Sequence, residues 1–298
     1  MDASTDRRRV RLLVTDLDNT LWDWFDIWFH SFSALLDRLV DLSGVSRETL
    51  EREIREIHQA RSTTEYSYLL NELPSLMALV DHPALPADKF DAAAHAQNRE
   101  RLTRTRLYPD VMETLQTIRK AQVPIVAYSE SLAFWTEWRI RKTGLDGVLT
   151  ALYTSPDHDF PSGVHPREIR TRPDHEYGLL KTTHEHVGRG LLKPNAALLN
   201  SIMDRFDTRP EETVYVGDSL MKDVAMAQQV GAIDVHAAYG LAQDRSGYEL
   251  LRRVSHWTQS DIERERELGK SRHIKPSYTL RASFSELLQE FDFKRGEE

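Results

Sequence analysis

The chain has 298 residues, of which 40% are hydrophobic and 29% are charged, and its formal net charge is −8. This composition is that of an ordinary globular protein with room for about two domains, and it excludes a chain that is disordered throughout. The acidic balance argues against a nucleic-acid coat or a membrane-surface protein, and the absence of cysteine excludes disulfides, a thiolate nucleophile and a cysteine-ligated zinc site.

The first predicted strand, 11–17, follows the N-terminal residues directly, and no apolar segment has the length of a signal peptide or a membrane span. We therefore expect a soluble cytoplasmic protein. Further apolar runs rich in Val, Ile, Leu and Tyr predict buried strands at 124–128, 148–153, 213–216 and 233–237. Helical patterns separate these runs, so the sequence predicts an α/β fold with helices on both faces of a parallel sheet.

Residues 23–105, between the first two strands, carry mostly helical patterns. Helices are predicted over 26–42, 46–60, 66–80 and 87–102. The stretch is too long for a crossover connection and too helical for a loop. We therefore expect residues 23–105 to form an inserted helical cap domain, and residues 8–22 and 106–298 to form the α/β core.

Two polar segments of the predicted core interrupt its alternation of strands and helices. Segment 156–190 is rich in Pro, Gly and His, and segment 241–276 is charged and partly helical in pattern. A last strand and helix are predicted over 278–291. Five histidines crowd the first segment, but their spacing fits no zinc motif; they are His158, His165, His175, His184 and His186, of which the last two would share a strand face.

Acidic residues come at the ends of two of the predicted strands. Asp16 and Asp18 end the first, and Asp218 and Asp223 follow the fourth. Ligands of open parallel sheets bind beyond the carboxyl ends of the strands. Two acid clusters there repel each other unless a cation lies between them, and ligands that are all oxygens suit Mg²⁺ best. Taken singly, each cluster is also explained as an Asp-rich turn or a helix cap.

A lysine and a serine complete the candidate site. Proline is favoured at the first helical position, so we expect Lys193, which precedes Pro194, to lie at a helix start. A cation is unfavourable there unless an anion occupies the same spot. Ser129 directly follows the strand at 124–128, where its hydroxyl can donate to a phosphoryl oxygen. Taken singly, a solvent-facing lysine and an ordinary N-cap serine are the simpler interpretations.

These residues together resemble the haloacid dehalogenase (HAD) superfamily, in their order and in their positions at strand ends. The residues that match the family's DxDxT, Ser/Thr, Lys and GDxxxxD motifs are Asp16, Asp18, Thr20, Ser129, Lys193, Gly217, Asp218 and Asp223. The resemblance spans residues 11 to 238 and implies a Rossmann-like core. The position of the helical insertion is similar to that of the family's C1 cap. The segments 156–190 and 241–276 go beyond the family pattern.

The resemblance also implies a role for each residue. Asp16 would be the nucleophile and a metal ligand, and Asp18 the general acid and then the general base, with its backbone carbonyl on the metal. Ser129 and Lys193 would hold the transferring phosphoryl group, while Asp218 and Asp223 would complete a Mg²⁺ site. These roles describe a Mg²⁺-dependent phosphatase that hydrolyses a small phosphomonoester through an aspartyl-phosphate.

Asp18 favours phosphate esters, because dehalogenases of the superfamily lack an acid at that position and a halide leaves without a proton. Two alternatives stay open: a phosphomutase with the same core chemistry, and a catalytically silent HAD-like binding protein. The aromatic run at Trp22 is predicted to pack in the core, although its nearness to Asp16 would also let it touch a leaving group. The sequence leaves open the identity of the substrate, the oligomeric state and the role of the two polar segments.

Overall fold

The structure is a computed structural model of the chain, and it describes residues 7–81, 83–157, 173, 176–260, 262–263 and 274–294. The chain divides into two compact units. The core unit comprises Met1–Asp23, Arg106–Leu241 and Arg272–Glu298, and the helical unit comprises Trp24–Thr105 and Ala242–Ser271.

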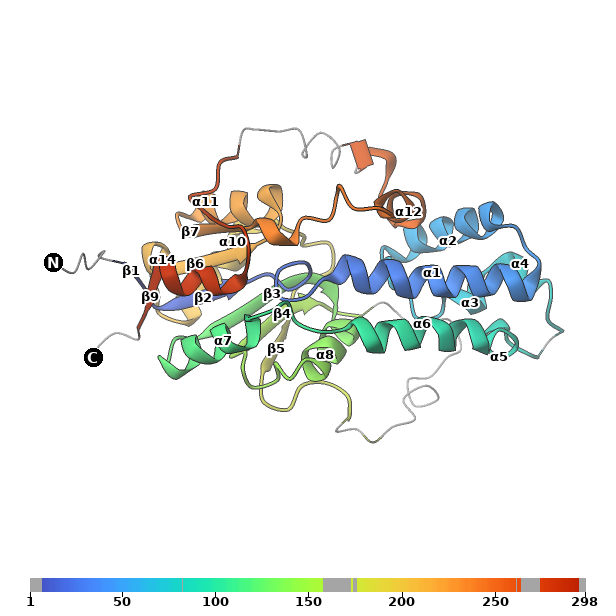
Figure 1. Cartoon of the computed structure of the whole chain (residues 1–298), viewed down its shortest axis with the longest axis horizontal. Coiled ribbons are helices and arrows are strands. Elements are labelled where there is room, and N and C mark those ends of the chain that lie inside the picture. The colour runs from blue at the N-terminus through green and yellow to red at the C-terminus, as the bar shows by residue number, and fades with distance from the viewer. Residues whose placement is uncertain are drawn as a thin grey trace. The chain divides into compact units, whose positions relative to one another are not determined.

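The core unit is built on a seven-stranded parallel sheet with the strand order β5-β4-β3-β2-β6-β7-β8 (Figure 1). A separate parallel pair joins β1 (Arg8–Val10) to β9 (Phe291–Phe293). The predicted α/β fold with a Rossmann-like sheet is confirmed, and each of the five predicted core strands is present. The strands of the large sheet are β2 (Leu12–Thr15), β3 (Ile125–Leu132), β4 (Ala151–Ser155), β5 (Thr183–His186), β6 (Thr213–Gly217), β7 (Ile233–Ala237) and β8 (Tyr278–Leu280).

Helices pack against this sheet and bury its strands. Alternate strand residues such as Leu12 and Val14 contact residues of α10 and α11 such as Leu199 and Met226. The intervening strand residues, Leu13 among them, are also buried. Burial on both faces explains why the strands read as continuous apolar runs. The α-helices of the core unit are α7 (Val111–Lys120), α8 (Ala133–Lys142), α10 (Ala196–Arg205), α11 (Ala225–Val230) and α14 (Leu287–Glu290).

Strand β2 lies between β3 and β6, which brings three strand ends to one edge of the sheet. Thr15 pairs with Ala127 of β3 and with Val216 of β6. The next backbone N–H, that of Asp16, still donates to the carbonyl of Val216 at 2.8 Å. The residues that follow these three strands therefore meet beyond their carboxyl ends, where sheets of this type bind ligands.

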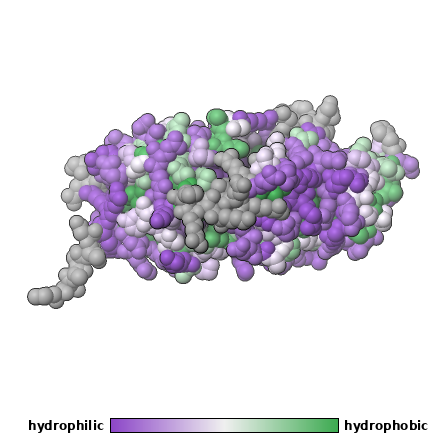
Figure 2. Space-filling model, turned by 90° about the horizontal axis from the view of Figure 1, so that it is seen from above, coloured by the Kyte–Doolittle hydropathy of each residue, from purple (hydrophilic) through white to green (hydrophobic). Residues whose placement is uncertain are grey.

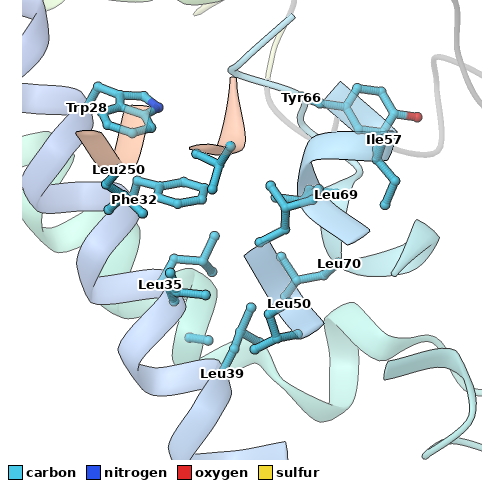
Figure 3. Packing of buried hydrophobic residues seen from close by; sticks show 14 of the residues in the cluster. Trp28, Phe32, Leu35, Leu39, Leu50, Ile57, Tyr66, Leu69, Leu70 and Leu250 are labelled. Carbon is cyan, nitrogen blue, oxygen red and sulfur yellow. The ribbon is translucent and has the colours of Figure 1, made fainter. Parts of the chain in front are cut away.

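The helical unit has its own hydrophobic core. Helices α1 and α6 run side by side in Figure 1. Figure 3 shows Trp28, Phe32, Leu35 and Leu39 of α1 within this core, together with apolar side chains from other helices of the unit. The helices of this unit whose bounds lie within the described residues are α1 (Trp24–Ser43), α2 (Arg47–Arg61), α3 (Leu69–Glu72), α4 (Pro74–Met77), α5 (Pro86–Lys89), α6 (Asp91–Arg104) and α12 (Tyr248–Val254).

Two of the predicted cap helices are each divided in the structure. The helix predicted over 66–80 is the pair α3 and α4, because Leu73 is extended before Pro74, as steric conflict with a following proline ring requires. The helix predicted over 87–102 is the pair α5 and α6, which are separated at Phe90. Helix α2 begins after Ser46, whose side chain accepts a hydrogen bond from the Thr49 N–H at 3.2 Å.

Segment Ala242–Ser271 belongs to the helical unit, whereas the sequence assigned residues 241–276 to the core. The physical reason is the apolar face of α12, since Leu250 and Leu251 are buried in the hydrophobic core of the helical unit. A guanidinium N–H of Arg55 on α2 also donates to the Arg252 carbonyl at 2.8 Å. The segment therefore adds a helix to the cap.

Segment 156–190 contributes strand β5 to the sheet, a polar strand that is not among the predicted apolar strands, although His184 and His186 were expected to share a strand face. It pairs with β4 from Ala151↔Thr183 to Thr154↔His186. The rings of His184 and His186 lie 4.5 Å apart, in agreement with the predicted shared face. The other three histidines, His158, His165 and His175, lie outside the described residues.

Figure 2 shows one face of the molecule, coloured by hydropathy. On the face shown in Figure 2, hydrophilic residues predominate and apolar areas are scattered among them. Within the described ranges, no helix has both the length and the apolar character that crossing a membrane requires.

Candidate active site

Asp16 follows β2 and is almost buried, with 7% of its surface exposed. Its Oδ1 accepts a hydrogen bond from Nζ of Lys193 at 2.5 Å, and its Oδ2 accepts one from the Thr20 hydroxyl at 3.3 Å. Burial raises the pKa of Asp16 to about 7 against the opposing charge of Lys193, and the charge of Asp223 raises it further. Neighbouring cations therefore decide whether this carboxylate is ionised at neutral pH.

Lys193 is a buried cation between two carboxylates. Its Nζ also donates to Oδ1 of Asp223 at 2.9 Å. It lies 4.8 Å from the ring centroid of Tyr128 and 5.6 Å from that of Tyr215, so aromatic faces line its other sides. Burial acts to lower the pKa of Lys193, but the charges of Asp16 and Asp223 raise it well above its ordinary value. The ammonium group therefore stays charged.

The prediction that Lys193 begins a helix is wrong. Helix α10 begins at Ala196, and Asn195 caps it by accepting a hydrogen bond from the Leu198 N–H at 3.1 Å. The side-chain oxygen of Asn195 supplies the cap acceptor, so Pro194 lies outside the helix. The negative charge that was expected beside Lys193 is present, since the carboxylates of Asp16 and Asp223 supply it.

Asp218 and Asp223 come after β6. Each of Asp16, Asp218 and Asp223 offers a carboxylate oxygen, and these oxygens all lie within 4.8 Å of one another. Burial, together with the charges of Asp16 and Asp223, raises the pKa of Asp218 well above its ordinary value. Such crowding of acids is favourable only with compensating positive charge. A donor set of carboxylate oxygens fits Mg²⁺, which prefers hard oxygen ligands.

The position of Asp223 depends on its neighbours in the chain. Its Oδ1 accepts a hydrogen bond from the Tyr215 hydroxyl and its Oδ2 accepts one from the Ser219 N–H, each at 3.1 Å. A Cβ atom at Gly217 would lie 2.3 Å from Cγ of Asp223. Only glycine leaves room for this carboxylate, which explains the Gly-Asp pair in the motif.

Three consecutive polar residues, 129–131, lie in the last part of β3, just before its final residue Leu132. Ser129 is 3% exposed, and its hydroxyl oxygen accepts a hydrogen bond from the Ser131 N–H at 3.1 Å. It caps no helix, because α8 begins later, at Ala133. Glu130 accepts a hydrogen bond from the Lys193 backbone N–H at 2.6 Å through Oε1 and one from Nζ of Lys222 through Oε2. Glu130 thus joins three chain segments of the site.

The carboxylate of Asp18 makes hydrogen bonds of its own, separate from those of Asp16 and Asp223. Its Oδ1 accepts a hydrogen bond from Nε1 of Trp22 at 2.6 Å, and its Oδ2 accepts one from the Ser131 hydroxyl. Among the described residues, its side chain is not part of the group that could hold a metal ion. A carboxylate placed in this way can exchange a proton without giving up a metal bond.

Sequence reasoning did not find the contacts of Glu130, Ser131 and Trp22. The signal for the first two was their place directly after Ser129 at the end of a strand. Trp22 was predicted to pack in the core, and it is fully buried as that requires, but its indole N–H also reaches Asp18.

A family model described as haloacid dehalogenase-like hydrolase matches residues 10–231. The chain belongs to this family. The match spans every residue of the candidate site of this HAD-like hydrolase, from Asp16 to Asp223. The resemblance predicted from the motifs is therefore confirmed.

Several individual proteins are similar to this HAD-like hydrolase. The glyceraldehyde 3-phosphate phosphatase of Methanopyrus kandleri is 24% identical over 242 residues, which are 79% of this chain and 87% of the relative. A HAD phosphatase structure from Thermococcus onnurineus has a TM-score of 0.49 at 16% identity, covering 96% of this chain and all of the other. A 2-haloacid dehalogenase structure from Pseudomonas syringae has a TM-score of 0.45 at 21% identity, covering 80% of this chain and 90% of the other.

Proposed function

We propose that this HAD-like hydrolase is a phosphatase that hydrolyses a small phosphomonoester through an aspartyl-phosphate formed on Asp16. The observation that carries the proposal is the grouping of Asp16, Asp218 and Asp223, with the buried ammonium of Lys193 bonded to the first and the third of these acids. The similarity to a glyceraldehyde 3-phosphate phosphatase supports the same class of reaction.

In the first step, a carboxylate oxygen of Asp16 forms a bond to phosphorus while the ester P–O bond breaks. Asp18 gives its proton to the departing alkoxide oxygen. In the second step, the Asp18 carboxylate takes a proton from water as the water oxygen attacks phosphorus. Inorganic phosphate leaves and the Asp16 carboxylate is regenerated, so one difficult hydrolysis becomes two easier transfers.

Positive charge is what lets an anionic carboxylate approach an anionic phosphate. Lys193 supplies one fixed cation, and Ser129 adds a hydroxyl that can donate to a phosphoryl oxygen. The residues that would hold Mg²⁺ are Asp16, Asp218 and Asp223, with the backbone carbonyl of Asp18. The bound ion would supply charge that neutralises the phosphoryl oxygens.

Asp18 selects phosphate esters over carbon–halogen substrates. An alkoxide is a poor leaving group unless it is protonated, whereas a halide needs no proton. Two hydrogen bonds hold the Asp18 carboxylate, and its charge helps to raise the pKa of Asp16; both observations support this role.

The test is release of inorganic phosphate from para-nitrophenyl phosphate and a panel of sugar phosphates in the presence of Mg²⁺. We expect turnover by the wild type, loss of turnover in Asp16→Asn with an unchanged circular dichroism spectrum, and loss in EDTA that added Mg²⁺ reverses. Isomerised substrate with little free phosphate would establish a phosphomutase instead. Failure on every substrate would contradict the proposal and favour a catalytically silent binding protein.

A further inference from the structure

Both carboxylate oxygens of Asp18 are engaged by donors that the family motifs do not include. The indole Nε1 of Trp22 donates to Oδ1 at 2.6 Å, and the Ser131 hydroxyl donates to Oδ2. Trp22 has none of its surface exposed. A hydrogen bond to a charged acceptor inside a protein is stronger than one in water, so this pair of bonds restricts the rotation of the carboxylate.

The two donors are themselves fixed to the backbone of the core unit. Trp22 forms β-bridges with Asp18 and with Leu107, and the neighbouring Tyr108 N–H donates to the Leu21 carbonyl at 2.9 Å. Ser131 lies at the end of β3, where its N–H donates to the Ser129 hydroxyl. The Asp18 carboxylate is therefore held between the turn that follows β2 and the end of β3.

The donors differ chemically in a way that distinguishes the two oxygens. An indole N–H only donates, so Oδ1 serves as its acceptor throughout the reaction. A serine hydroxyl both donates and accepts and can turn about its C–O bond. Oδ2 is accordingly the oxygen whose hydrogen bonding can change while Asp18 exchanges a proton.

We propose that Trp22 and Ser131 are positioning residues that hold Asp18 for proton transfer through Oδ2. This inference rests on the proposed phosphatase function. When the ester P–O bond breaks, the proton on Oδ2 passes to the leaving alkoxide oxygen. When the aspartyl-phosphate is hydrolysed, Oδ2 takes a proton from the attacking water. Trp22 and Ser131 act through Asp18, to which each donates a hydrogen bond.

A purely structural tryptophan would fill space and leave the chemistry unchanged. The helical unit offers such a residue for comparison, since Trp28 is 3% exposed and its indole N–H has no hydrogen-bond partner among the described residues. Trp22→Phe and Trp28→Phe remove the same atoms from two buried sites. Only the first removes a donor to Asp18.

The experiment compares kcat/KM for two substrates whose leaving groups differ in their need for a proton. One is para-nitrophenyl phosphate, whose phenolate leaves without protonation, and the other is the sugar phosphate that the wild type hydrolyses fastest. Because kcat/KM includes the steps only up to formation of the aspartyl-phosphate, it isolates the general-acid step.

For Trp22→Phe and Ser131→Ala we expect kcat/KM for the sugar phosphate to fall about tenfold or more, and kcat/KM for para-nitrophenyl phosphate to fall by less than about threefold. Ser131→Thr, which keeps a hydroxyl, should restore the sugar phosphate value, and Trp28→Phe should leave the ratio of the two values unchanged.

Equal losses of kcat/KM on both substrates, or no loss in either variant, would overturn the inference. Weaker positioning of a general acid must slow the substrate whose leaving group needs a proton more than the substrate whose leaving group does not. If Trp22→Phe does not fold, the two Ser131 variants decide alone. A wild type that hydrolyses neither substrate contradicts the proposed function, whereas an active wild type whose variants show no dependence on the leaving group contradicts only this inference.

Discussion

The Lys193 ammonium nitrogen lies 2.9 Å from Oδ1 of Asp223, and only 2% of each side chain is exposed. The same nitrogen contacts Asp16, so one buried cation compensates two buried acids. Removing one partner of such a group leaves uncompensated charge in a poorly solvated place. Stability and the capacity to bind a divalent ion are therefore linked at this site.

Lys193→Met tests this link. Without the ammonium group, we expect the free energy of unfolding at pH 7 to fall by about 3 kcal/mol. Saturating Mg²⁺ should restore part of the loss, since an ion that binds only the folded state stabilises it. Urea unfolding with and without Mg²⁺ measures both effects. Lys222→Met is the control: its partly exposed ion pair should cost less than about 1 kcal/mol. Equal stability of Lys193→Met and the wild type would refute the coupling.

Gly217→Ala tests the close approach of Asp223. The added methyl group would lie 2.3 Å from Cγ of Asp223, so we expect that carboxylate to be displaced and Mg²⁺ affinity to fall about tenfold or more. Isothermal titration calorimetry measures the affinity. Gly188→Ala is the matched control, because its new methyl group meets only the flexible end of Leu191, at 3.2 Å. Unchanged Mg²⁺ affinity in Gly217→Ala would mean that Asp223 does not contribute to ion binding.

His58 makes the stability of the helical unit depend on pH. Burial lowers its pKa from 6.5 to about 4, and Nδ1 lies 2.6 Å from the Val254 carbonyl oxygen. The unfolded state therefore binds the proton more readily, so stability is full above pH 6.5 and is lost as the pH falls toward 4. The loss amounts to roughly 3 kcal/mol at the lower limit. Urea unfolding of the wild type and His58→Asn across this range measures it, and parallel curves for the two proteins would contradict the assignment.

Glu130 is predicted to set the position of Lys193. Glu130→Ala removes the acceptor of the Lys193 backbone N–H, and we expect kcat to fall about tenfold or more with a smaller change in KM. Glu130→Gln keeps an acceptor oxygen and should recover most of the loss. Steady-state kinetics on para-nitrophenyl phosphate measures both variants. If Gln is as damaging as Ala, the negative charge matters and the hydrogen bond does not.

Much of the core and the candidate site is predictable, because chemistry and burial leave strong local patterns. The core strands are continuous apolar runs, and the acids at 16, 218 and 223 follow strand ends that the topology brings to one edge. Strand β5 was not among the predicted strands because its sequence, Thr-His-Glu-His, is polar and lacks the apolar run that marks a buried strand. It lies at the edge of the sheet. Its pairing depends on β4, which is distant in sequence.

The remaining features depend on contacts between distant segments. Helix α12 joins the helical unit through residues nearly two hundred positions from α2, as in the 2.6 Å contact between His58 and Val254. Glu130 and Ser131 show no pattern of their own, since their roles arise from where Lys193 and Asp18 lie in three dimensions. The start of α10 is set by Asn195 and not by Pro194, because the side-chain oxygen of Asn195 accepts a hydrogen bond from the Leu198 N–H.

The most direct test of the central claim is acid-quench mass spectrometry of the protein during turnover with Mg²⁺ and substrate. Acid stops the reaction while acyl-phosphates survive, and peptide mapping locates the modification. We predict one phosphoryl group on the peptide that contains Asp16, and none on that peptide in Asp16→Asn. Steady release of phosphate with no phosphorylated Asp16 peptide, or with the group on another residue, would contradict nucleophilic attack by Asp16.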